Sequence, residues 1–218
     1  MIPPDQRTGS WATVPTLSTE AAGIHTEEQR QVLLGLAASS IESGLEHSRP
    51  LHIEPADCPD WLAEQRATFV TLKAAGMLRG CIGTLHARTS LCEDVTCNAW
   101  AAASRDPRFR AVTAAELSGL VMQISILGIP EKISFDSEQD LASQLRPGID
   151  GLILTDRAAT GTFLPAVWES CPEPGSFLQH LKLKAGLAAD YWSETIEASR
   201  YTTESFGADL KNIERCRP

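Results

Sequence analysis

The chain has 218 residues, of which 43% are hydrophobic and 22% are charged, and its formal net charge is −9 at pH 7. This length and composition allow one large domain or two small lobes in an ordinary globular protein. The negative charge disfavours nonspecific binding to nucleic acid or to anionic membranes, although RNA binding through a local basic cluster stays open.

Neither membrane insertion nor secretion is predicted. The sequence contains no run of about 18 apolar residues, the length that a transmembrane helix needs. Its amino terminus, MIPPDQRTGSWATVPTLSTE, has proline and polar residues where a signal peptide has its apolar stretch. We therefore expect a cytoplasmic protein whose six cysteines are reduced thiols rather than a disulfide framework.

The first elements in chain order are an arm and a helix. Residues 1–22 are rich in Pro, Ser, Thr and Gly without periodicity, which predicts a flexible arm before a domain at residues 23–218. Thr26 and Gln29 form a capping-box pattern, and apolar residues then recur at helical spacing. The sequence therefore predicts a long helix that ends near His47.

A hairpin and a mixture of helices and strands are predicted next. Between residues 67 and 85 the apolar pattern changes to period two, in two runs joined by a short connection with a glycine, which predicts a β-hairpin. Ser90 is a candidate cap for a helix that must end before Pro107. The other predicted elements are strands at 120–127, 151–155 and 197–206, and helices capped by Ser137 and Ser176. This irregular interleaving favours an α+β fold over a doubly wound sheet.

The segment LRGCIGTL at residues 78–85 combines the apolar rhythm of a strand with two glycines, an arginine and a cysteine. In a regular strand, Arg79 and Cys81 point to the same face as Gly83. We therefore expect the Arg79 guanidinium to lie close to the Cys81 sulfur and to favour its thiolate. The missing side chain of Gly83 should leave room for a ligand, and Gly80 is a second position where close approach is possible.

Other interpretations of this strand stay open. Cysteine is among the most often buried residue types, so Cys81 could be a packed small apolar side chain. Arg79 could then simply pair with a carboxylate. No histidine has the spacing needed to act as a base for Cys81. In a regular strand His86 would point to the opposite face from Cys81, unless Gly83 marks a bulge.

The segment SRDPRFR at residues 104–110 places three arginines close together in an acidic protein. Together with Arg79 they could form an anion-binding pocket, because planar guanidinium groups suit carboxylates and phosphates. Asp106 and Arg108 are the candidates for this role. The alternative is a turn in which Asp106 and Pro107 end a helix and the arginines are solvated or paired.

Acidic and metal-binding patterns give weaker signals. Glu131 follows a predicted strand, where its carboxylate could act as an acid or base, and helix or turn capping is the alternative. His52 and Glu54 match only the beginning of a zinc deaminase signature, because no Pro-Cys-x-x-Cys follows. The sequence also has no H-E-x-x-H, no C-x-x-C and no Walker loop, so no metal site and no cofactor is predicted.

Six segments that run in order over nearly the whole domain resemble the AMMECR family, named for a chromosomal region linked to Alport syndrome, midface hypoplasia and elliptocytosis. The segments are LRGCIGTL at 78–85, DPRF at 106–109, ISILGIPEKI at 124–133, GLIL at 151–154, FLPAVWE at 163–169 and FLQHLKLKAGL at 177–187. The chain departs from the family at Ala166, where a glutamine is usual.

The resemblance implies a two-lobed α+β domain with a mainly antiparallel sheet flanked by helices, in which the Arg-Gly-Cys-Ile-Gly strand lies near a cleft between the lobes. It also implies an intracellular protein whose reaction is not established. Similar bacterial and archaeal domains are associated with Memo-like proteins and radical S-adenosylmethionine (radical SAM) enzymes, which points to a shared modification pathway and to such proteins as partners.

Two functions are expected as alternatives. The first is a cytoplasmic enzyme that uses a Cys81 thiolate in the interlobe cleft, acting on an unknown small molecule or macromolecule. The second is a non-catalytic scaffold whose groove binds protein or RNA. The residues assigned to the enzyme's site are catalytic Cys81, Arg79 and Glu131, and substrate-binding Gly80, Gly83, Asp106 and Arg108.

Overall fold

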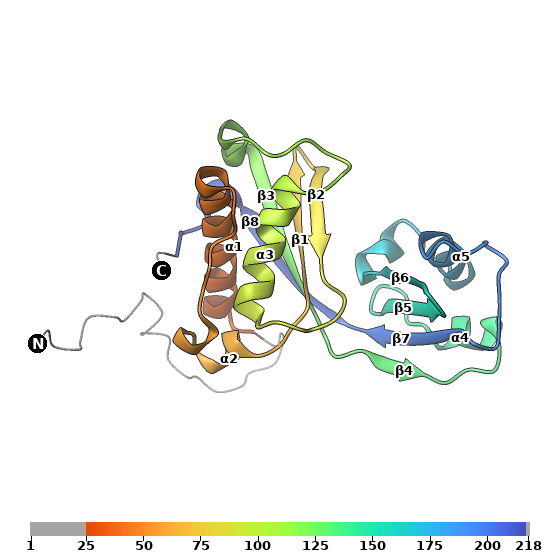
Figure 1. Ribbon diagram of the computed structural model, residues 1–218. Helices are drawn as coiled ribbons and strands as arrows, with labels where there is room; N and C mark the ends of the chain where they lie inside the picture. Colours follow the sequence, from red (N-terminus) through yellow and green to blue (C-terminus); the bar gives the residue numbers. More distant parts are fainter. Residues whose placement is uncertain (1–24, 217–218) are drawn as a thin grey trace, which may run out of the picture. The chain divides into compact units, whose positions relative to one another are not determined.

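The computed structural model describes residues 25–216, and the arm expected at residues 1–22 lies outside them. The chain divides into two compact units, the second formed by Leu127–Glu204 and the first by the described residues on either side of it (Figure 1). The fold contains two four-stranded sheets together with helices. Every strand pair whose register is described is antiparallel, and the α+β prediction is confirmed.

The first unit is built on the sheet with strand order β2-β1-β3-β8. Helices α1 and α3 cover one face of this sheet (Figure 1). Short 3-10 helices lie at Pro55–Asp57, Ala114–Gly119 and Leu210–Asn212. The helices and strands of this unit are α1 (Glu27–His47), α2 (Asp60–Ala63), β1 (Thr68–Ala74), β2 (Met77–Gly83), α3 (Leu91–Ser104), β3 (Leu120–Leu127) and β8 (Thr203–Asp209).

Local sequence signals account for the ends of α1. The Thr26 hydroxyl accepts a hydrogen bond from the Gln29 backbone N–H at 3.3 Å, and the Gln29 side chain accepts one from the Thr26 N–H at 2.8 Å. This capping box satisfies two donors that the first helical turn leaves unpaired. At the other end, Ser48 adopts a left-handed conformation with φ of 58°. The predicted helix and its cap are confirmed.

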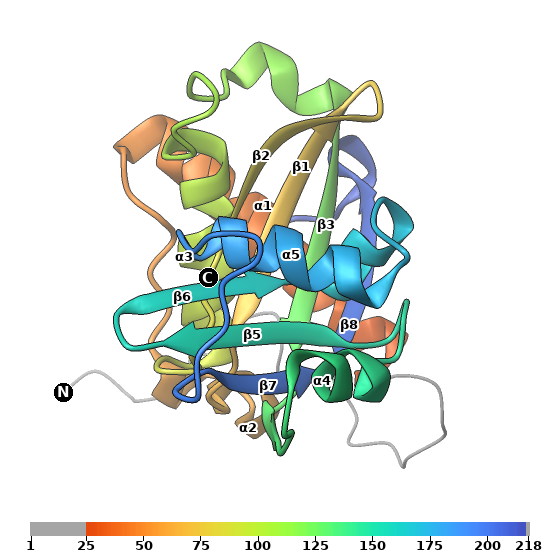
Figure 2. The ribbon, with the colours of Figure 1, turned by 90° about the vertical axis from the view of Figure 1, so that its right-hand side faces the viewer.

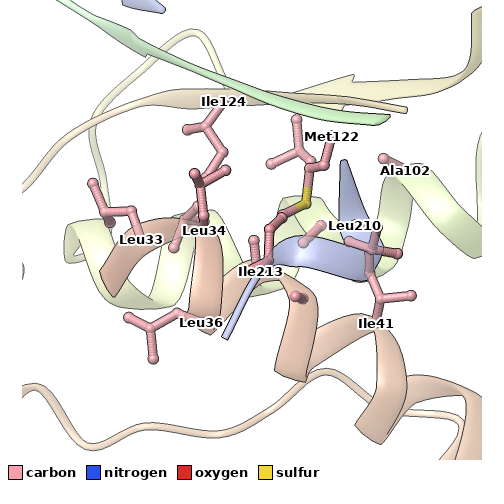
Figure 3. Close-up of a cluster of buried hydrophobic side chains, with 14 of the residues drawn as sticks. Leu33, Leu34, Leu36, Ile41, Ala102, Met122, Ile124, Leu210 and Ile213 are labelled. Atoms are coloured by element: carbon pink, nitrogen blue, oxygen red, sulfur yellow. The ribbon is translucent and has the colours of Figure 1, made fainter. Parts of the chain in front are cut away.

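An apolar core joins α1 to the sheet of the first unit. Alternation along β1 buries Val70 and Leu72, and the neighbouring strand β3 buries Met122 and Ile124 on the same side. Burial of each large aliphatic side chain stabilises the fold by about 2 kcal/mol. Figure 3 shows these strands facing side chains of α1 and of the carboxy-terminal segment, including Leu33, Leu34, Leu36, Ile41, Leu210 and Ile213.

The predicted hairpin is confirmed, but its second strand is irregular. Ala75 and Gly76 have positive φ angles of 48° and 78°, as a two-residue hairpin turn requires. Gly80 pairs with Leu72 and Leu78 pairs with the next residue along β1, so Arg79 has no partner opposite it. Arg79 is thus the extra residue of a β-bulge, and the strict alternation that we expected from residue 78 to 83 is broken there.

The second unit carries the sheet with strand order β4-β7-β5-β6. Figure 2 shows β7, β5 and β6 of this sheet side by side. Helix α5 packs along β6, and an aromatic stack of Trp168 on Phe177, with ring centroids 3.8 Å apart, fills its core. A 3-10 turn lies at Pro165–Glu169. The helices and strands of this unit are β4 (Glu131–Ile133), α4 (Glu138–Gln144), β5 (Gly151–Asp156), β6 (Ala159–Phe163), α5 (Pro174–Lys184) and β7 (Glu197–Tyr201).

Two predictions for this part of the chain were wrong. Helix α5 begins at Pro174 with Glu173 as its N-cap residue, so Ser176 lies inside the first turn and does not cap the helix. The single strand expected at 197–206 is two strands in different sheets, β7 and β8. They are separated at Thr202, whose carbonyl oxygen accepts the Gly128 N–H at 2.8 Å.

Within residues 25–216, no helix is long and apolar enough to cross a membrane. All six cysteines lie in this part of the chain, and all six are free thiols.

Candidate active site around Cys81

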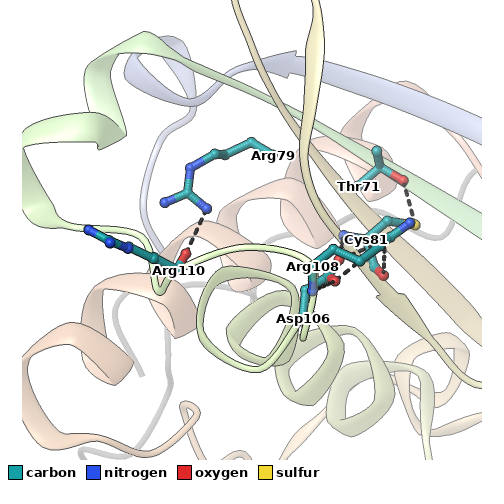
Figure 4. A network of polar contacts seen from close by, with 6 residues as sticks. All are labelled: Thr71, Arg79, Cys81, Asp106, Arg108 and Arg110. Atoms are coloured by element: carbon teal, nitrogen blue, oxygen red, sulfur yellow. Dashed lines mark hydrogen bonds and ion pairs between the residues drawn. The ribbon is translucent and has the colours of Figure 1, made fainter.

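The Cys81 thiol lies on β2, partly exposed, opposite Thr71 of β1. The Thr71 hydroxyl lies 3.3 Å from the sulfur and donates a hydrogen bond to it (Figure 4). This contact places a polar hydroxyl beside the sulfur, so Cys81 is not surrounded by apolar side chains alone. Thr71 could not be predicted as the partner of Cys81, since a regular two-residue hairpin would have placed Gly80 opposite Thr71.

A buried carboxylate fixes the backbone beside the thiol. Asp106 follows the last residues of α3, and only 2% of its side chain is exposed. Its carboxylate accepts the Cys81 backbone N–H at 2.8 Å and the Arg108 Nη2 at 2.6 Å. The hydrogen bond from the Arg108 guanidinium, assisted by the N–H of Cys81, holds the pKa of the Asp106 carboxyl well below its usual range. Asp106 therefore stays ionised and ties the loop after α3 to β2.

Arg108 is the arginine whose guanidinium interacts with Cys81, through its carbonyl oxygen and its side chain (Figure 4). Its Nε and Nη2 donate to Asp106, and Nη2 also donates to the Cys81 carbonyl oxygen at 3.3 Å. The pKa of Arg108 is raised, chiefly by the hydrogen bond to Asp106, then by the Asp106 charge and by interaction with the Cys81 side chain. About half of the Arg108 side chain, 54%, is exposed, so it can also meet an anion from solvent.

The expected neighbour of the sulfur, Arg79, points elsewhere. Its Nε and Nη2 donate to Glu116 at 2.9 and 3.3 Å, and its Nη1 donates to the Arg110 carbonyl oxygen at 2.8 Å. Figure 4 shows its guanidinium directed away from Cys81. The prediction that Arg79 lies beside the thiol was therefore wrong, because the bulge breaks the alternation on which it depended. The alternative, that Arg79 pairs with a carboxylate, is what the structure shows.

The Arg79 pair secures the segment that follows α3. Glu116 also accepts the backbone N–H and the hydroxyl of Thr113, at 2.8 and 2.9 Å. The Arg79 hydrogen bond, followed by the Thr113 N–H, lowers the pKa of Glu116 to about 2. Arg79 thus ties β2 to the segment that follows Arg108 in the chain.

Both glycines of the strand are required by packing within the protein. A Cβ atom at Gly80 would lie 2.1 Å from the carbonyl oxygen of Ala102 in α3. A Cβ atom at Gly83 would lie 2.3 Å from the ring of Phe69. The space beside Gly83 is therefore filled by an aromatic side chain, contrary to our expectation that it is open for a ligand.

A buried polar network holds the end of β2 in place and was missed by the sequence analysis. Asp94 of α3 is 4% exposed and accepts hydrogen bonds from the backbone N–H and hydroxyl of Thr68, both at 2.7 Å. It also accepts the Thr84 hydroxyl at 2.7 Å and the Asn98 amide at 2.9 Å. Burial raises the pKa of the Asp94 carboxyl. The i, i+4 spacing of Asp94 and Asn98 on a predicted helix was the available signal.

The site residues Cys81, Asp106 and Arg108 all belong to the first unit, whereas Glu131 belongs to the second. Glu131 is the first residue of β4, is exposed, and forms a 3.5 Å ion pair with Arg200 on the neighbouring strand. It caps neither a helix nor a turn. In the part of the chain that the structure describes, no group of three or more His, Cys, Asp or Glu side chains could hold a metal ion.

Comparisons with known proteins agree with the six motif segments. The model of the AMMECR1 family matches residues 34–206. A protein of Thermofilum pendens is 36% identical over 180 residues, which cover 76% of this chain and 82% of the relative. A protein of Methanothermobacter thermautotrophicus is 33% identical over 190 residues, which cover 84% of this chain and 96% of the relative. The crystal structure of an uncharacterized protein from Pyrococcus horikoshii matches with a TM-score of 0.79 and 31% identity, covering 88% of this chain and 98% of that chain. The chain therefore belongs to the AMMECR1 family.

Proposed function

We propose that this protein is a cytoplasmic thiol-dependent enzyme in which Cys81 is the nucleophile and Arg108 binds the anionic group of the substrate. One observation carries this proposal. The Arg108 guanidinium, fixed by the buried carboxylate of Asp106, lies beside a partly exposed thiol. The substrate class that suits such a site is a small molecule or a protein side chain that bears a carboxylate or phosphate next to an electrophilic centre.

The proposed chemistry follows from the side chains that contact Cys81. A thiolate is the reactive form of cysteine, and a nearby guanidinium and a hydroxyl donor both favour it. Arg108 and Thr71 supply these two groups at Cys81. Because Asp106 holds Arg108 through two guanidinium nitrogens, the charge is positioned before a substrate binds.

We further propose that the reaction belongs to a modification pathway shared with Memo-like and radical SAM proteins, as the resemblance of the motif segments to the AMMECR family implies. The exposed guanidinium of Arg108 and the thiol of Cys81 are the features that a modification substrate would contact.

Site-resolved alkylation tests the proposal. The intact chain is treated with limiting iodoacetamide near neutral pH, and each cysteine is followed by peptide mass spectrometry, with glutathione as the free-thiol reference and Cys81→Ser as the control. The enzyme proposal expects Cys81 to react faster than glutathione. Reaction of Cys81 only after addition of denaturant would show that the thiol is merely packed.

A non-catalytic scaffold is the second candidate, and one surface feature favours it. Met77 and Leu78 of β2 and Val121 of β3 are large apolar side chains on the two strands that flank β1, and they are 72%, 40% and 38% exposed. Apolar patches of this kind mark protein-binding surfaces. A Met77→Gln variant that loses binding to a purified Memo-like protein, while Cys81→Ser keeps it, would support the scaffold over the enzyme.

A further inference from the structure

Two cysteines of the first unit lie in contact with each other. The Cys58 thiol donates a hydrogen bond to the Cys92 sulfur, and the two sulfur atoms are 3.5 Å apart. Cys58 directly follows the short 3-10 helix at Pro55–Asp57, and Cys92 is the second residue of α3. The pair therefore joins two elements through residues that are 34 positions apart in the chain. Neither thiol is used in the site proposed at Cys81.

The backbone around the two cysteines is already held together. The Leu91 N–H donates to the Glu64 carbonyl oxygen at 2.8 Å. Gln65 forms an isolated antiparallel bridge with Ser90. Helix α2, which begins two residues after Cys58, packs against α3 (Figure 1). Because cysteines that are held apart cannot be bridged without backbone movement, these contacts favour a bond between the two sulfurs.

The two thiols differ in exposure. Cys58 is partly exposed, whereas Cys92 is completely buried. An oxidant from solvent therefore reaches the Cys58 sulfur first, while the protected Cys92 sulfur lies in contact with it and can react with the oxidised form. The Ser90 hydroxyl lies 3.3 Å from the Cys92 sulfur, so a polar group is present where that thiol must give up its proton.

The surroundings of the pair make oxidation slow and the product durable. Burial, followed by the hydrogen bond and the charge of Cys92 and by the charge of Asp57, raises the pKa of the Cys58 thiol to about 12. Since the thiolate is the reactive form, little of it is present near neutral pH. A reductant that attacks the exposed Cys58 sulfur of a disulfide must displace Cys92 as a thiolate in a buried position, which disfavours reduction.

We propose that Cys58 and Cys92 form a site of oxidation by peroxides, at which the two thiols become an intramolecular disulfide. In the first step the Cys58 sulfur attacks one oxygen of hydrogen peroxide and the O–O bond breaks. Cys58 becomes a sulfenic acid, and the other oxygen leaves as water with the proton of the thiol. In the second step the Cys92 sulfur attacks the Cys58 sulfur, the S–O bond breaks, and the leaving hydroxide takes the Cys92 proton to form a second water. The two thiols together lose two electrons, which the peroxide gains.

The disulfide encloses the hairpin that carries Cys81. Strands β1 and β2 both lie between Cys58 and Cys92 in the chain. A cross-link of this kind restricts the unfolded chain, and it does so more for a longer enclosed loop. Oxidation should therefore raise the melting temperature of the protein by about 5 °C.

Peptide mass spectrometry after oxidation tests the proposal on the intact chain. The reduced protein is diluted to disfavour links between molecules, treated with hydrogen peroxide at mildly alkaline pH, blocked with N-ethylmaleimide and digested without reductant. We expect the peptide that links Cys58 to Cys92 to be the main intramolecular disulfide. Dithiothreitol should reduce this disulfide about tenfold more slowly than it reduces oxidised glutathione.

Serine variants separate the pair from the other cysteines. Cys97→Ser removes an exposed thiol of the same helix and should leave the yield of the link unchanged. Cys58→Ser, at the partly exposed position, should abolish both the link and the rise in melting temperature. Cys92→Ser should leave a sulfenic acid at Cys58 that dimedone labels. Cys81→Ser should form the link normally, so this inference and the proposed function can fail independently.

Three results would overturn the inference. The first is the absence of a peptide linking Cys58 to Cys92 in the folded protein, or its appearance only after addition of denaturant. The second is a mixture of disulfides in which Cys97 is linked as often as Cys92. The third is a melting temperature that oxidation leaves unchanged, since the link would then not restrain the hairpin.

Discussion

Asp106 accepts the backbone N–H of Cys81 at 2.8 Å, although the two residues are 25 positions apart in the chain. The same carboxylate holds the Arg108 guanidinium. One buried acid therefore sets both the strand that carries the thiol and the cation beside it. The DPRF segment supplies both residues of this pair. Its aspartate holds the Cys81 backbone and the Arg108 guanidinium in place, and its arginine lies at Cys81.

Replacing Asp106 by asparagine should destabilise the protein by about 2–3 kcal/mol. The change leaves Arg108 without its counter-ion and replaces a charged acceptor of the Cys81 N–H by a neutral one. Urea denaturation measures the effect, with Asp57→Asn as the control at an exposed position of the same unit. Equal free energies of unfolding for the two variants would show that the Asp106 pair contributes nothing to folding.

Stability should fall on acidification, with a contribution from Glu116. Its pKa is lowered to about 2 in the folded protein, below the unfolded value of about 4.3. A lowered folded pKa means that its stabilisation is complete above the unfolded value and is lost as the pH falls toward 2. Glu116→Gln should therefore lower stability at neutral pH by about 1 kcal/mol and flatten the pH dependence in this window. Urea midpoints measured across that window check this, and parallel curves for the two proteins would refute it.

Gly80→Ala should be strongly destabilising. The added methyl group would lie 2.1 Å from the Ala102 carbonyl oxygen, and backbone atoms on both sides must move to relieve the overlap. We expect a loss of about 2–3 kcal/mol in the free energy of unfolding. Gly119→Ala is the matched control, because no atom lies within 4 Å of its added Cβ. A melting temperature for Gly80→Ala that matches the control would show that β2 can move freely away from α3.

Cys81 should prefer anionic reagents more than Cys97 does. Arg108 lies beside Cys81, whereas burial, followed by the charges of Glu93 and Asp94, raises the pKa of the Cys97 thiol. The ratio of iodoacetate to iodoacetamide rates should be about threefold or more higher at Cys81. Because both thiols belong to one chain, the net charge of the protein affects both ratios. A lower ratio at Cys81 would argue against an anion-binding role for this site.

The regular elements could be predicted because their signals are local. The capping box at Thr26, the serine cap at Ser90 and the glycine-containing turn before Met77 each depend on a few adjacent residues. Their prediction needs no knowledge of distant contacts. The break at Thr202 was missed because it depends on pairing with Gly128, far away in the chain.

The strand that carries Cys81 was predicted, but the predicted neighbour of its sulfur was wrong. Strict alternation along the strand predicted Arg79 on the same face as Cys81. Because Arg79 is itself the extra residue of a β-bulge, the alternation is broken there and the prediction fails. The arginine found beside the sulfur, Arg108, was a candidate for substrate binding, but its link to Cys81 spans 27 positions and depends on Asp106. Such a link arises from tertiary packing of the loop after α3 and leaves no periodic trace in the sequence.

The most direct test of the account is the rate of iodoacetamide alkylation at Cys81 in Arg108→Gln and Arg105→Gln, measured at one neutral pH. Arg105 is an exposed arginine three positions away and serves as the matched control. We expect Arg108→Gln to slow the reaction at Cys81 about five- to tenfold and Arg105→Gln to leave it unchanged. Equal rates in the two variants would contradict the claim that Arg108 activates the thiol.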